Sequence, residues 1–151
     1  MPRYKDPDDV LKTMQPILDR CAKRNNGIDG IAFLSRFDIK ARSQVEGYGG
    51  TFDATAAAAL LANFREAHKD TFKDESNLNY VSFLSTTEDG EITAWSVVVL
   101  YEIYSLVFTG KLKNVSRYSV HRGTVEEYVK ELELLIEEYE KRIVIETTSE
   151  S

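Results

Sequence analysis

The chain has 151 residues, a common length for one domain, and its 42% hydrophobic and 29% charged residues are typical of a globular protein. Its net charge of −6 argues against a general nucleic-acid binder, which needs a basic face to neutralise phosphates. The single cysteine, Cys21, excludes an internal disulfide framework and fits a reducing compartment. The first residues are charged, and apolar runs such as 97–100 are far shorter than the roughly 20 residues of a membrane helix. We therefore expect a cytoplasmic protein without a membrane partner.

The first third of the chain predicts one helix followed by two strands. Asp6-Pro7 is typical of a helix start, and helical spacing joins the apolar residues Val10, Leu11, Met14, Ile17, Leu18 and Cys21. Pro16 predicts a kink or a late start, and Gly27 a helix end nearby. Residues 28–34 and 39–45 predict strands, with a turn at 35–38.

A second helix is expected from a cap at Asp53 to about Lys69. Its predicted core stripe is Ala57, Leu60, Leu61, Phe64 and His68. The opposite face carries small residues: Thr55, Ala58, Ala59 and Ala62. Two interpretations stay open, because alanine is the best helix former and because small residues also let another backbone approach closely.

The second half predicts a hairpin, a third strand and a long helix. Residues 80–86 and 91–101 flank a turn at 88–90, and residues 104–109 follow as a strand. A basic connection spans 111–122, and Thr124 with Glu127 predicts a capping box at the start of the last helix. We expect one domain over residues 1–143 and a disordered polar tail over 144–151.

Chemical motifs are missing from the sequence. The glycine loop at 47–50 lacks the Gly-Lys-Ser/Thr ending of a phosphate-binding loop and is interpreted as turn glycines. His68 and His121 have no nearby Cys or Asp at ligand spacing, and the basic surroundings of His121 indicate a surface contact. We expect a non-enzymatic protein with no catalytic residue, metal or cofactor.

The element order, together with residues 30–41 (GIAFLSRFDIKA) leading into 52–61 (FDATAAAALL), resembles the roadblock (dynein light-chain type) family. The resemblance implies an α+β fold, with a five-stranded antiparallel sheet and helices on both faces. It also implies a homodimer formed through the second helix and an edge strand. Such proteins are non-enzymatic platforms that regulate small Ras-like GTPases or load cargo onto motors.

Two functional hypotheses follow. The first is a homodimeric scaffold that binds a protein partner such as a small GTPase. The residues expected in the helix pair of the dimer are Ala58, Leu61, Ala62 and Arg65. A charged rim made of Arg65, Glu66 and Lys69 is expected to orient the partner. The alternative is a small-ligand or nucleotide-binding module, or an intracellular inhibitor protein. It would use a candidate anion site made of Gly47, Gly49, Gly50, Lys111, Lys113, Arg117 and Arg122.

Overall fold

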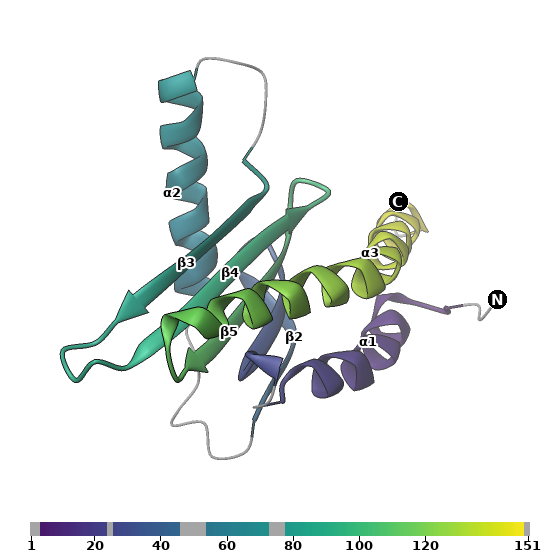
Figure 1. Ribbon diagram of the computed structural model, residues 1–151. Coiled ribbons are helices and arrows are strands. Elements are labelled where there is room, and N and C mark those ends of the chain that lie inside the picture. The colour runs from purple at the N-terminus through teal and green to yellow at the C-terminus, as the bar shows by residue number, and fades with distance from the viewer. Residues whose placement is uncertain (1–3, 24–25, 46–53, 73–77, 150–151) are drawn as a thin grey trace.

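The protein folds around a single five-stranded antiparallel sheet with the strand order β2-β1-β5-β4-β3. The computed structural model describes residues 4–23, 26–45, 54–72 and 78–149 (Figure 1). The elements are α1 (Pro7–Cys21), β1 (Gly30–Ser35), β2 (Asp38–Gln44), α2 (Ala54–Phe72), β3 (Tyr80–Thr86), β4 (Ile92–Leu100), β5 (Tyr104–Leu112), a 3₁₀ turn (Val115–Arg117) and α3 (Tyr118–Ser149). The predicted α+β fold class with helices on both faces is confirmed.

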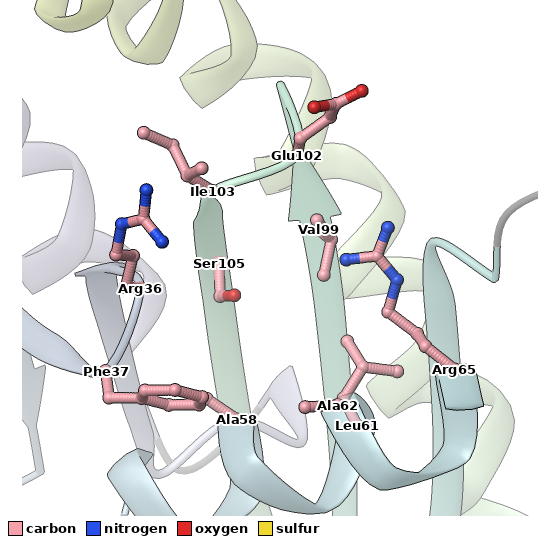
Figure 2. Close-up of a pocket in the computed structure, with 10 residues that line it drawn as sticks. All are labelled: Arg36, Phe37, Ala58, Leu61, Ala62, Arg65, Val99, Glu102, Ile103 and Ser105. Atoms are coloured by element: carbon pink, nitrogen blue, oxygen red, sulfur yellow. The ribbon is translucent and has the colours of Figure 1, made fainter. Parts of the chain in front are cut away.

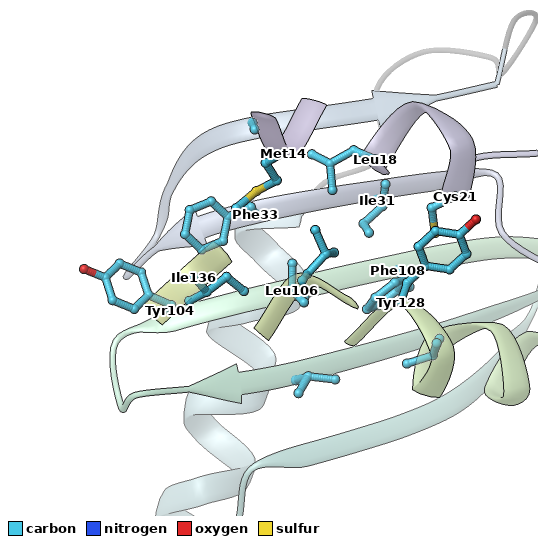
Figure 3. Close-up of a cluster of buried hydrophobic side chains, with 14 of the residues drawn as sticks. Met14, Leu18, Cys21, Ile31, Phe33, Tyr104, Leu106, Phe108, Tyr128 and Ile136 are labelled. Carbon is cyan, nitrogen blue, oxygen red and sulfur yellow. The ribbon is translucent and has the colours of Figure 1, made fainter. Parts of the chain in front are cut away.

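One face of the sheet is covered by α1 and α3 together (Figure 1). Alternate residues of β1 and β5 point to this face, where Phe33 stacks on Tyr104 at 5.6 Å between ring centroids and meets Tyr139 edge-on at 5.3 Å. The helices contribute fully buried side chains to this cluster: Val10, Met14 and Leu18 from α1, and Leu132 and Ile136 from α3. Figure 3 shows Met14, Leu18 and Ile136 among them. This is the larger of the two hydrophobic cores.

The other face is covered by α2 (Figure 1). The strands contribute alanine, leucine and valine side chains to this contact, and the helix contributes mainly alanines. The buried members are Ala32, Leu34, Val97, Val99 and Val107 from the strands and Ala54, Ala57, Ala58 and Leu61 from α2.

Helix α1 begins where the sequence predicts, since the side chain of Asp6 accepts a hydrogen bond of 2.9 Å from the amide of Asp9. The predicted late start at Pro16 is wrong, because α1 runs from Pro7 to Cys21 with Pro16 inside it; the kink stays a prediction. Pro16 lies on the exposed side, where water can satisfy the carbonyl that its ring deprives of a donor. The helix also ends before Gly27, which has a φ of 81° in the following connection.

Helix α3 is longer at both ends than the sequence predicts. The basic connection is mostly regular, because β5 extends to Leu112 and the helix begins at Tyr118. Thr124 is therefore no cap; its hydroxyl lies within hydrogen-bond distance of the carbonyl oxygens of Val120 (3.0 Å) and Asn26 (2.7 Å), and its one proton can be donated to either. The predicted disordered tail is also wrong as far as Ser149, because α3 continues to that residue.

Candidate functional site

Helix α2 is rotated relative to the predicted core stripe. Ala57 and Leu61 of that stripe are buried as predicted, but Leu60 and Phe64 are 38% and 41% exposed, and Ala58 from the opposite face is only 5% exposed and packs on the strands. The physical reason is the sheet surface, whose small and β-branched side chains allow the helix backbone to approach where it carries alanine. Of the small residues on the predicted opposite face, Ala58 packs against the chain's own sheet, whereas Thr55 and Ala59 are exposed.

The six residues predicted to form an interface fall into two groups. Ala58, Leu61, Ala62 and Arg65 all line one hollow of about 190 Å³ between α2 and the sheet (Figure 2). Glu66 and Lys69 are exposed on α2 and do not line it. Residues of the β1–β2 and β4–β5 turns also line the hollow, and no sequence pattern predicted their part in it. We call it the α2 hollow.

A second hollow, of about 310 Å³, lies between the C-terminal half of α2 and strand β3. Its walls are largely apolar and include Phe64, Ala67, Leu78 and Val81. Further along the same sheet face, Phe83 of β3 stacks on Trp95 of β4, with ring centroids 6.4 Å apart, and both are only partly buried. Apolar surface therefore remains open where α2 and β3 meet.

Strand β3 is an edge of the sheet, since it pairs with β4 alone within the described ranges. The amide of Val99 donates to the carbonyl of Asn79 (2.8 Å), and the amide of Thr87 to that of Glu91 (2.9 Å). In an antiparallel ladder such pairs alternate, so odd-numbered residues of β3 bond to β4. The amides and carbonyls of Tyr80, Ser82 and Leu84 consequently point outward from the sheet.

The alternative anion site is only partly visible. Gly47, Gly49 and Gly50 lie outside the described residues. Lys111 forms an ion pair of 3.4 Å with Glu91, and the guanidinium of Arg122 lies 5.9 Å from the ring centroid of Tyr118. Lys113 and Arg117 are exposed in the connection between β5 and α3. The nucleotide or small-ligand site stays a prediction.

His121 is fully buried, so the predicted surface contact is wrong. Its Nδ1 lies 3.0 Å from the carbonyl oxygen of Gly27, and its Nε2 lies 2.8 Å from the hydroxyl of Ser96. Burial lowers the pKa of the imidazole. The neutral ring can donate from Nδ1 to Gly27 and accept from Ser96. The residue sits deep because Gly27 leaves room, since a Cβ there would lie 2.9 Å from the Cα of His121.

Reactive groups do not converge in the part of the chain that the structure describes. Burial raises the pKa of the Cys21 thiol to about 12, so it stays protonated and unreactive at neutral pH. No group of three or more His, Cys, Asp or Glu side chains in the described ranges could hold a metal ion. None of the described helices has an apolar stretch long enough to cross a membrane.

No protein-family model and no curated protein matches the sequence. Solved structures are similar in fold. An MglB with a tetrameric arrangement has a TM-score of 0.65 at 12% identity, covering 86% of this chain and 92% of that one. Myxococcus xanthus MglB has a TM-score of 0.62 at 13% identity, covering 92% and 95%. A roadblock/LC7 domain from Streptomyces avermitilis has a TM-score of 0.54 at 12% identity, covering 81% and 96%. The chain therefore has the roadblock/LC7 fold.

Proposed function

We propose that the protein is a non-enzymatic, homodimeric platform that presents a composite surface to a protein partner. One observation carries the proposal: the outward edge of β3 lies beside the apolar surface that α2 leaves open. An unpaired edge is a template for a further strand, and a second copy supplies an identical edge in antiparallel orientation. The two sheets would then join into one.

Burial of the exposed α2 side chains supplies the driving force for this assembly. Leu60 and Phe64 are 38% and 41% exposed on the solvent side of the helix. Full burial of a side chain of this size contributes about 1.5–3 kcal/mol. Because Leu60 and Phe64 are partly exposed in one copy, burying them in the dimer contributes a part of that free energy for each copy. The tetrameric arrangement of the similar MglB structure supports self-association.

The partner class is proposed from the resemblance to roadblock-type proteins. Roadblock-type platforms regulate small Ras-like GTPases, and this supports a GTPase as the partner of the dimer. In this proposal Glu66 and Lys69, exposed on α2, orient the partner at the rim of the interface. The dimer would supply a binding surface that holds the partner in a defined orientation and would supply no catalytic group.

Light scattering on a size-exclusion column, over a hundredfold range of concentration, tests the assembly. The wild-type chain should have twice its 17.2 kDa mass. Leu84→Pro should give monomers, because it removes an amide that points outward from the sheet and makes no hydrogen bond to β4. Phe64→Glu should also give monomers, because it places a charge in the contact between the two copies. Leu134→Glu is the matched control, because Leu134 is 71% exposed on α3 and should not alter the dimer. A wild-type monomer at every concentration contradicts the proposal.

The partner is tested separately by calorimetry with small Ras-like GTPases loaded with GDP or a non-hydrolysable GTP analogue. We expect the dimer to bind one nucleotide state more tightly. A dimer that binds no GTPase in either state contradicts the partner assignment and leaves the assembly standing.

A further inference from the structure

The α2 hollow is a built site with chemistry of its own. It lies between the N-terminal half of α2 and two sheet turns, the β1–β2 turn and the β4–β5 turn, and encloses about 190 Å³. All of its walls come from one copy of the chain, and the open β3 edge is not among them. An inference about this hollow is therefore independent of the proposed dimer.

Two guanidinium groups face the hollow from different elements. Figure 2 shows Arg36, from the β1–β2 turn, and Arg65, from α2, on opposite sides, with Ser105 of β5 between them. In the described part of the chain neither arginine forms an ion pair. Glu102 lies at the rim, so the hollow carries two positive charges and one negative charge. It is a locally basic site on a chain whose net charge is −6.

The backbone of the two turns beside the hollow adopts positive φ angles at residues that are not glycine. Among the described residues, three that are not glycine have a positive φ: Arg36 (55°), Tyr101 (51°) and Glu102 (66°). All three lie in the turns beside the hollow, and the amide of Arg36 donates to the carbonyl of Ile103 (2.7 Å), which ties the turns together. Glycine would adopt these angles with less strain. The chain nevertheless has an arginine and a glutamate at two of these positions, and both residues line the hollow.

The remaining walls are apolar. Phe37 and Leu61 lie on the α2 side, and Val99 and Ile103 on the side of the sheet and its turn. A cavity of about 150 Å³ holds a benzene ring, so the α2 hollow has room for a single amino-acid side chain. A guanidinium binds a carboxylate through two parallel hydrogen bonds, and the Ser105 hydroxyl is a further donor.

We infer that the α2 hollow binds one carboxylate of a protein partner, borne by an acidic residue with apolar neighbours. The two arginines hold the carboxylate, and the apolar walls pack against the side chains beside it. Glu102 at the rim repels a second negative charge, so a singly charged carboxylate is favoured over a phosphate dianion. This gives the hollow a specificity that a basic patch alone would lack.

The inference is tested by titrating peptides into the 151-residue chain and monitoring the arginine Nε–H resonances by NMR. Acetyl-Leu-Glu-Leu-amide should shift the resonances of Arg36 and Arg65 in a saturable way. Acetyl-Leu-Gln-Leu-amide, which lacks only the charge, and inorganic phosphate should leave both in place at the same concentrations. A third peptide, acetyl-Leu-Gln-Leu, has a neutral glutamine side chain and a free C-terminal carboxylate, so it separates a side-chain carboxylate from a chain terminus as the bound group. Weaker binding than the glutamate peptide supports the side chain. Tighter binding overturns the inference in favour of a chain terminus.

Variants separate binding from folding. Arg36→Gly removes the guanidinium and relieves the positive φ, so it should raise the melting temperature while weakening the glutamate peptide at least tenfold. Arg65→Gln should weaken the peptide to a similar extent, and the control Arg117→Gln, with the same charge change away from the hollow, should not. Equal binding of the glutamine peptide, equal binding of phosphate, or full affinity in Arg36→Gly would overturn the inference. Because that variant is expected to be more stable, lost binding cannot be attributed to misfolding.

Discussion

The two faces of the sheet are packed with different kinds of side chain. On the α1/α3 face, large rings interlock, as Phe33, Tyr104 and Tyr139 do, and two helices close over them. On the α2 face, one alanine-rich helix lies on valines and leaves Leu60 and Phe64 exposed. The α1/α3 face holds the larger core and keeps one hollow, of about 250 Å³, between α3 and strands β3 and β4. The α2 face keeps two hollows and an open sheet edge beside it. The comparison assigns stability to the first face and recognition to the second.

The largest effect should come from truncating the ring at the centre of the α1/α3 core. Phe33 is fully buried, and Phe33→Ala leaves a cavity lined by aromatic neighbours that cannot collapse. We expect the free energy of unfolding to fall by about 3–5 kcal/mol. Urea unfolding at low protein concentration measures the loss. A cost under about 1 kcal/mol would contradict the assignment of stability to this face.

Truncation on the α2 face should cost less. Leu61 is 2% exposed, but its side chain borders the α2 hollow, so Leu61→Ala enlarges an existing space next to a helix that can shift. We expect about 2 kcal/mol, the low end for such a change. The same urea experiment applies, and a cost equal to that of Phe33→Ala would break the comparison.

Acid should weaken the α1/α3 side through His121. Burial lowers the pKa of the folded imidazole below its usual value of 6.5, so the unfolded chain binds the proton more readily. The contribution to stability is present above pH 6.5 and is lost as the pH falls through the lowered folded pKa. Unfolding of wild type and His121→Gln at pH 7.5 and 5.5 measures it. The wild type should lose more stability than the variant, and parallel losses would contradict the role of this histidine.

The smallest effect on the fold should come from the exposed side of α2. Phe64→Ser changes a side chain that is 41% exposed and outside the buried cluster. At concentrations low enough to dissociate any dimer, the free energy of unfolding should change by no more than about 0.5 kcal/mol. At high concentration the wild type should gain stability and the variant should not. Differential scanning calorimetry over a range of concentration distinguishes the two regimes, and a wild-type melting temperature independent of concentration would count against assembly through this side.

The elements with a distinct local pattern were predictable from sequence. Residues 80–86 were predicted as a strand with the bounds that β3 has, and the Asp6 cap fixed the start of α1. The orientation of α2 was not, because apolar residues lie on every side of its alanine run, and the sheet surface selects Ala58 over Leu60. His121 was misplaced because its burial depends on Gly27, distant in sequence.

The α2 hollow illustrates a different limit. Arg65 was predicted as an interface residue from its place on the helix, but Arg36 and Glu102 come from turns in which a positive φ falls on residues other than glycine. Local propensity gives no sign of such positions, since turn chemistry favours Gly, Asn or Asp there. Only the paired register of β1 with β5 brings the two turns together.

Hydrogen–deuterium exchange along β3, at dilute and at high protein concentration, tests the central claim most directly. The amides of Val81 and Phe83 bond to β4 and should be protected at both concentrations. The outward amides of Ser82 and Leu84 should exchange quickly when dilute and become protected at high concentration, as the edge pairs with a second copy. Fast exchange of these outward amides at every concentration would contradict the account, because the recognition face would then stay open.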